Sequence, residues 1–161
     1  VMVVHNETST GATSRIADIR AAIDRTAHPA LLMVDTISGL GSLEYEHDAW
    51  GIDVSIAGSQ KGLMLPPGLG FNAVSEKALA VAKANPGMRS YWDWQEVINI
   101  NKAGTWPYTP ATNLLFGLRD RHGTTLVLVT HAPELAARCD RVLRLRDGLV
   151  EAEDRRQRAA S

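Results

Sequence analysis

Short apolar runs alternate along the chain with polar clusters and with stretches of helical periodicity. Ile16, Ile19 and Ile23 recur at helical spacing, and His28–Pro29 ends that periodicity. Ser75 stands where a second helix would need an N-cap. The pattern predicts strands over residues 1–4, 30–34, 53–57 and 69–74, and helices over residues 15–26 and 75–84.

The order of these elements, strand, loop, helix and strand, predicts an α/β fold with a mainly parallel sheet and flanking helices. Polar clusters follow three of the predicted strands, at residues 6–10, 35–38 and 59–61. Ligands bind outside the carboxyl ends of the strands in such sheets. The three clusters therefore predict one site at that edge. His5, next to the first cluster, is interpreted as a loop residue.

Composition narrows the range of partners. The chain has 161 residues, 45% of them hydrophobic and 22% charged, as in globular domains. A net charge of −1 offers no electrostatic basis for binding nucleic acid. The apolar runs are too short to span a bilayer, so membrane insertion is not expected. Cys139 is the one cysteine, which fits a reducing, cytoplasmic location.

Two chemically useful groups fall in the polar clusters. Asp35 ends one predicted strand, and Lys61 follows another, 26 residues later. A crossover connection would bring both to one edge of the sheet. From the pattern alone, the aspartate is more often a turn former and the lysine a solvated charge.

Four longer motifs favour a functional role for Asp35 and Lys61 over a purely structural one. They are HNETSTG (5–11), LLMVDTISGLG (31–41), GIDVSIAGSQKGLMLPPGLG (51–70) and WPYTPATNLLFGLRD (106–120). In this order and spacing they resemble the class V aminotransferases of the serine–glyoxylate and alanine–glyoxylate type, which depend on pyridoxal 5′-phosphate (PLP). The resemblance covers residues 1–119 and implies part of the large domain of the type I PLP fold.

The resemblance implies roles for individual residues in the three clusters. Lys61 would hold PLP as a Schiff base, and Asp35 would pair with its pyridinium nitrogen. Ile37 would pack on the ring, and Thr8 would hydrogen-bond near the ring hydroxyl.

Phosphate contacts are implied as well. Gln60 and Ser59 would reach the cofactor phosphate, and Thr109 would bind the phosphate of the neighbouring subunit across a homodimer interface. Trp106 stands where some relatives have a tyrosine for that contact. The alternative for Trp106 and Thr109 is interface packing and a turn.

The implied reaction moves an amino group from serine or alanine to glyoxylate, with small amino acids and oxo acids as substrates. The chain begins in what reads as a core strand, so we expect a fragment. The family's upstream phosphate loop and stacking aromatic, and its downstream arginine for the substrate carboxylate, have no counterpart here. Little or no turnover is therefore expected.

A second resemblance begins near residue 120. All nine aromatic residues lie at or before Phe116, and TTLVLVTHAPELAARCDRVLRLRDGLVE (124–151) resembles the end of an ABC transporter ATP-binding domain. His131 would match its switch histidine. No GxxxxGK[ST] loop accompanies it, so an inert strand-end histidine is the favoured interpretation.

This segment predicts strands over residues 125–129 and 141–145, a helix over residues 133–138, and a hairpin turn at Asp147–Gly148. The domain prediction is an aminotransferase part (1–119), an ABC-like segment (120–151) and a disordered tail (152–161), joined within residues 114–123. A chimera, an ATP-binding remnant and a hybrid without function remain open beside the aminotransferase fragment.

Overall fold

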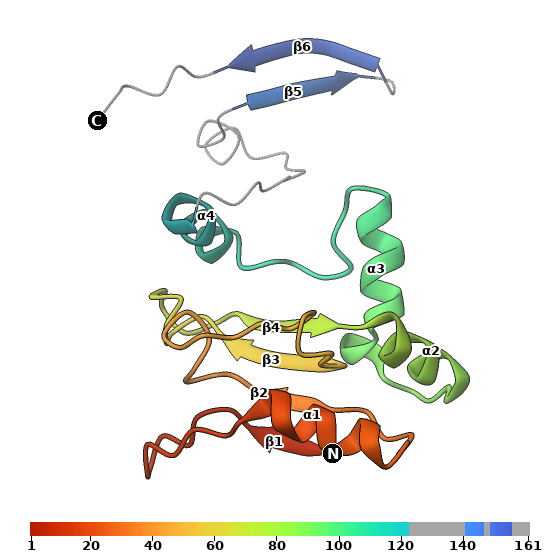
Figure 1. The fold of residues 1–161 in the computed structure, drawn as a ribbon. Helices are drawn as coiled ribbons and strands as arrows, with labels where there is room; N and C mark the ends of the chain where they lie inside the picture. The colour runs from red at the N-terminus through yellow and green to blue at the C-terminus, as the bar shows by residue number, and fades with distance from the viewer. Residues whose placement is uncertain (123–140, 147–148, 156–161) are drawn as a thin grey trace.

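The structure, a computed structural model, describes residues 1–122, 141–146 and 149–155. One sheet has the strand order β1-β2-β3-β4 (Figure 1). The strands are β1 (Met2–Val4), β2 (Met33–Asp35), β3 (Val54–Gly58) and β4 (Gly70–Val74). β1, β2 and β3 run parallel, and β4 is antiparallel to β3. The predicted α/β fold with a mainly parallel sheet is confirmed.

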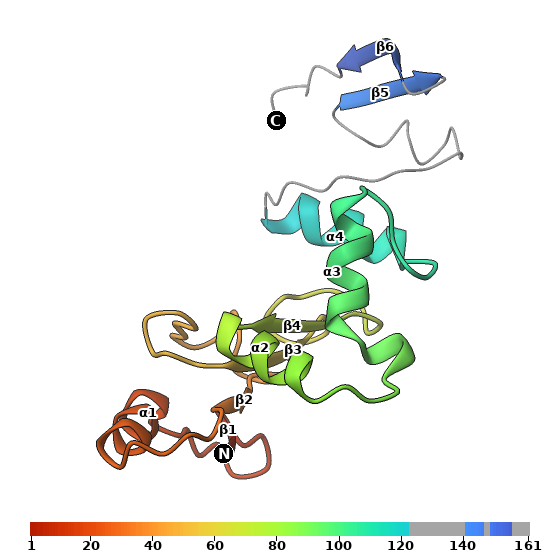
Figure 2. The same cartoon turned by 90° about the vertical axis from the view of Figure 1, so that its right-hand side faces the viewer.

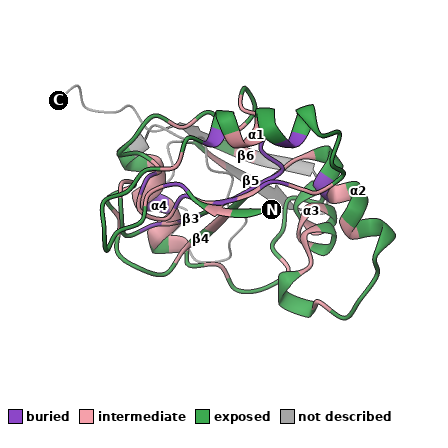
Figure 3. Ribbon diagram, turned by 60° about the horizontal axis from the view of Figure 1, so that its bottom comes forward, coloured by how far each residue is buried: buried purple, intermediate pink, exposed green. Residues whose placement is uncertain are grey.

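Helix α1 (Ile16–Arg25) covers one face of β1 and β2, as Figure 2 shows. Its Ile16 and Ile23 pack with Leu32 and Val34 in the main hydrophobic core. The periodicity that predicted this helix is the periodicity of its buried face. Burial is concentrated in β2, β3 and the inner side of α1 (Figure 3).

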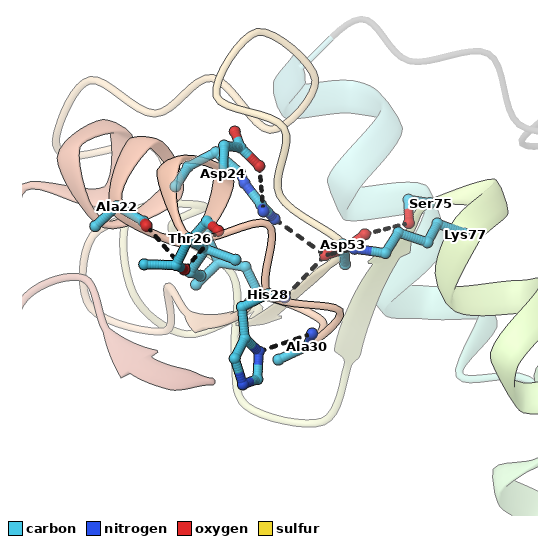
Figure 4. A network of polar contacts seen from close by, with 11 residues as sticks. Ala22, Asp24, Thr26, His28, Ala30, Asp53, Ser75 and Lys77 are labelled. Carbon is cyan, nitrogen blue, oxygen red and sulfur yellow. Dashed lines mark hydrogen bonds and ion pairs between the residues drawn. The ribbon is translucent and has the colours of Figure 1, made fainter.

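A buried carboxylate ties three elements together at the amino end of β3 (Figure 4). Asp53 is 4% exposed, and its Oδ2 accepts a hydrogen bond from the Leu32 amide at 2.8 Å. Its Oδ1 accepts from the Ser75 hydroxyl at 3.1 Å. Arg20 and Lys77 each approach Oδ2 to 3.6 Å. Asp53 therefore fixes α1, the entry to β2 and the start of α2.

The hydrogen bonds of Asp53 and Ser75 explain where β2 and α2 begin. Residues 30–34 were predicted as a strand, but β2 begins at Met33, since the Leu32 amide bonds the Asp53 side chain. Helix α2 (Glu76–Ala84) begins after Ser75, whose hydroxyl accepts from the Ala78 amide at 3.1 Å, so the predicted N-cap is confirmed.

The second half of the described chain is helical. The 3-10 helix η1 (Ser90–Trp92) precedes α3 (Trp94–Lys102), whose N-cap Asp93 accepts from the Gln95 amide at 2.9 Å. Helix α4 (Thr112–His122) runs unbroken through the predicted boundary between residues 119 and 120. Among the described residues, none of the helices is long and apolar enough to cross a bilayer.

The C-terminal strands form a separate two-stranded antiparallel sheet. They are β5 (Arg141–Arg146) and β6 (Leu149–Arg155). The strand predicted over residues 141–145 is confirmed. The tail predicted from residue 152 was placed too early, because β6 pairs through Arg155. The elements predicted over 125–129 and 133–138, His131 and the turn at 147–148 lie outside the described residues.

Candidate active site

The three polar clusters meet at one edge of the sheet. They follow β1, β2 and β3, which are parallel neighbours, so their carboxyl ends lie side by side. Hydrogen bonds join the first two clusters: the Ser38 hydroxyl donates to the Asn6 carbonyl at 2.6 Å, and the Asn6 amide donates to Ser38 Oγ at 3.4 Å. The predicted convergence is therefore present.

Asp35 lies on the sheet face opposite α1. It pairs in register with Val4 and Ile56, so its carboxylate stands in a row between two apolar side chains. Oδ1 accepts a hydrogen bond from the Ile37 amide at 2.9 Å. Within the described part of the chain, the other carboxylate oxygen has no hydrogen-bond partner. Asp35 is thus held from one side and open to a donor on the other.

Lys61 lies on the loop between β3 and β4 and is exposed. Its carbonyl accepts from the Met64 amide at 2.8 Å, which closes a turn directly after the lysine. Its ammonium group has no ion pair with any described residue. The amine is therefore available, and the backbone beneath it is fixed.

The loops that carry Asp35 and Lys61 touch through their backbones. A Cβ added to Gly62 would lie 2.2 Å from the Leu40 carbonyl oxygen and 2.9 Å from the Gly41 carbonyl carbon. No side chain fits in that space. Gly62 is therefore required by the close approach of the two backbones, whereas Gly41 is required by its positive φ of 78°.

Ser59 organises the lysine loop from within. It is fully buried, and its hydroxyl donates to the Pro66 carbonyl at 2.7 Å and accepts from the Leu69 amide at 3.2 Å. Its single hydroxyl proton is thus used inside the protein, and a phosphate contact by Ser59 stays a prediction. Gln60 is exposed next to Lys61, with its side-chain oxygen over Gly58.

The other predicted site residues lie on separate segments. Thr8 is exposed in the turn that follows β1, and Ile37 is half-buried directly after β2. Thr109 is exposed between α3 and α4, next to Tyr108, whose ring lies 4.9 Å from that of Tyr91. The structure places Asp35, Ile37 and the 59–61 cluster after neighbouring strands, while Thr109 lies on the segment between α3 and α4.

His5 is a buried residue rather than the open loop residue expected from the sequence. It is 3% exposed, and its ring lies 5.2 Å from Tyr45 and 6.3 Å from Trp50. Burial lowers the pKa of the imidazole below its usual value. Among the described residues, Nδ1 has no hydrogen-bond partner. The sequence signal for this burial is the apolar run of residues 1–4 just before His5. The His5 amide continues the pairing of β1 with β2.

Comparison with known proteins identifies the family. The model for class-V aminotransferases matches residues 1–115. The chain belongs to the class V aminotransferase family. Members of this family depend on PLP. The groups at the sheet edge fit that cofactor, since Asp35 offers a carboxylate oxygen and Lys61 an amine that no described residue binds.

Curated relatives of this class V aminotransferase are longer. Serine–glyoxylate aminotransferase of Methylorubrum extorquens is 54% identical over 125 residues, which cover 74% of this chain and 31% of that protein. L-aspartate–glyoxylate aminotransferase of Paracoccus denitrificans is 37% identical over 161 residues, covering 100% of this chain and 36% of the relative. The chain thus spans about a third of their length.

Solved structures agree with the fold. Alanine–glyoxylate aminotransferase from Nostoc sp. superposes with a TM-score of 0.68 at 29% identity, covering 74% of this chain and 32% of that one. The Paracoccus alignment extends over the C-terminal residues, beyond the stretch that the family model matches.

Proposed function

We propose that this chain is a segment of a PLP-dependent aminotransferase that transfers an amino group from serine or alanine to glyoxylate. The observation that carries the proposal is the juxtaposition of the Asp35 and Lys61 loops, locked by the contact of Gly62 with Leu40 and Gly41. All three relatives described above carry glyoxylate in their names.

Asp35 would hold the proton on the pyridine nitrogen of PLP. Its open carboxylate oxygen is the acceptor for that N–H, while the Ile37 amide keeps the other oxygen in place. The flanking Val4 and Ile56 lower the local polarity, which strengthens the pair. When bound, PLP supplies an electron sink for the carbanion at the substrate α-carbon.

Lys61 would anchor the cofactor and then move a proton. Its amine, once free, would carry a proton between the substrate carbon and the cofactor carbon, which requires a long flexible side chain on a fixed backbone. The turn from Lys61 to Met64 and the buried Ser59 supply that fixed backbone. Gln60 would donate to the phosphate, Thr8 would act near the ring hydroxyl and Ile37 would pack on the ring.

A homodimer is part of this proposal. Thr109 would reach the cofactor phosphate of a neighbouring subunit, and the exposed Tyr108 lies next to it in the chain. Tyr108 is 41% exposed and Trp92 76% exposed. Tyr91 connects the two, with its ring 4.9 Å from that of Tyr108 and 5.2 Å from that of Trp92, and exposed apolar patches can mark protein–protein contact sites. Analytical ultracentrifugation of this protein, with and without Tyr108→Ala, tests it: Tyr108→Ala should shift the dimer toward monomer, and a wild type that is monomeric would contradict the dimer.

PLP titration tests the proposal. We expect an absorbance band at about 420 nm that is bleached by borohydride. The band should be lost in Lys61→Ala and retained in the control Lys102→Ala. Equal bands in all three proteins would contradict it. Because the chain spans about a third of its relatives, we expect transamination by the 161 residues alone to stay near that of free PLP.

The ATP-binding alternative concerns residues 120–151. The antiparallel β5 and β6 around residues 147–148 fit the predicted hairpin of that segment. A hairpin is common to many folds, so it favours the alternative weakly. Calorimetric titration with MgATP tests the ATP-binding alternative. Heat of binding would support this alternative, and no heat of binding would contradict it.

A further inference from the structure

The turn after Asp35 is a compact hydrogen-bonded unit. The Gly39 and Leu40 amides both donate to the Thr36 carbonyl, at 3.0 and 2.8 Å. Thr36 is itself fixed on β3, because its amide and its hydroxyl donate to the Ile56 carbonyl at 2.8 and 2.9 Å. At the start of the unit, the Ile37 amide holds Asp35 Oδ1. These hydrogen bonds connect Gly39, through Thr36 and the Ile37 amide, to the Asp35 carboxylate.

The far end of this turn rests on the His5 imidazole. A Cβ built on Gly39 would lie 2.6 Å from Nδ1 of His5, closer than real atoms approach. Gly39 is buried, and its φ is not positive, so an alanine would suit the backbone but not the space. The imidazole ring also packs against the rings of Tyr45 and Trp50.

The backbone of His5 is fixed as well. Its amide donates to the Asp35 carbonyl at 2.8 Å, which continues the β1–β2 ladder, and its carbonyl accepts from the Ser14 amide at 2.8 Å. The imidazole thus lies between the rings of Tyr45 and Trp50 and the turn that contains Gly39.

We propose that His5 is a positioning residue for the cofactor site: its imidazole supports Gly39 and so sets the position of the Asp35 carboxylate and the Ile37 side chain. This inference rests on the proposed PLP site. It assigns a role to a side chain that does not touch the cofactor and acts through the turn of residues 36–40.

The test is a double-mutant cycle with PLP affinity as the readout. His5→Ala removes the support and Gly39→Ala pushes against it, so each should weaken PLP binding about tenfold. In the double variant the new methyl group occupies space that the imidazole has left. Its affinity should return to within about threefold of wild type, a strongly non-additive result.

Ile23→Ala is the matched control. It truncates a buried side chain of the same core, on α1 and away from the turn. It should lower the melting temperature but keep PLP affinity. His5→Phe keeps an aromatic ring under Gly39 and should bind PLP like wild type; if His5→Ala does not fold, Gly39→Ala and His5→Phe carry the test.

The outcomes separate the two claims. A wild type without a PLP band overturns the proposed function and this role together. A wild type that binds PLP, with unchanged affinity in folded His5→Ala and Gly39→Ala, overturns the role of His5 alone. Additive losses in the double variant, or an equal loss in Ile23→Ala, also overturn it.

Discussion

Removing the Asp53 carboxylate should destabilise the domain more than removing any surface carboxylate. Asp53→Ala leaves the buried Leu32 amide without its acceptor, and a hydrogen bond to a charged group contributes about 1.5–3 kcal/mol. It also removes the acceptor of the Ser75 hydroxyl at the start of α2.

The two cations near Asp53 add less. The Lys77 side chain is 48% exposed and contributes under about 1 kcal/mol. The Arg20 side chain is 14% exposed but keeps Asp24 as a partner. Together these terms put the loss of unfolding free energy in Asp53→Ala at about 3–4 kcal/mol, a large part of the stability of a small domain.

Asp24→Ala is the matched control, because Asp24 bonds the same Arg20 from α1. Its side chain is 64% exposed, so the expected loss is about 0.5 kcal/mol or less. Urea unfolding followed by circular dichroism at pH 7 measures both. Losses for Asp53→Ala and Asp24→Ala that agree within experimental error would refute the account of Asp53 as the anchor of three elements.

Two further predictions concern the site. Gly62→Ala places a methyl group against the Leu40 carbonyl, so it should lower the unfolding free energy by about 1–3 kcal/mol and abolish PLP binding. Gly70 has open space around it, so the control Gly70→Ala should leave PLP binding unchanged. Because burial lowers the pKa of His5 below 6.5, the unfolded state takes up its proton first, so the stability contributed by the neutral ring is present above pH 6.5 and lost as the pH falls toward the folded pKa. Unfolding free energies of wild type and His5→Phe from pH 7.5 to 5 should therefore diverge, and parallel curves would contradict this.

Local signals in the sequence predicted most elements of the fold. The isoleucine periodicity of α1 and the Ser75 cap of α2 act over a few residues, so the pattern shows them directly. Helix α3 was missed although Asp93 caps it and Trp94 and Val97 lie at helical spacing. These two local signals are sufficient to predict the helix from the sequence.

Tertiary contacts explain what the pattern did not predict. The start of β2 depends on an Asp53 side chain 21 residues further along the chain. Ser59 uses its hydroxyl inside its own loop, and Gly62 is required by a loop more than 20 residues earlier. His5 is buried because Tyr45 and Trp50 cover it.

Borohydride reduction of the PLP-treated protein, followed by peptide mass mapping, tests the central claim most directly. The chain has four lysines: Lys61, Lys77, Lys83 and Lys102. The account predicts that the reduced cofactor is attached to Lys61 alone at stoichiometric PLP, and that Asp35→Ala weakens this labelling. Label spread over all four lysines, or label on Lys61 that does not depend on Asp35, would contradict it.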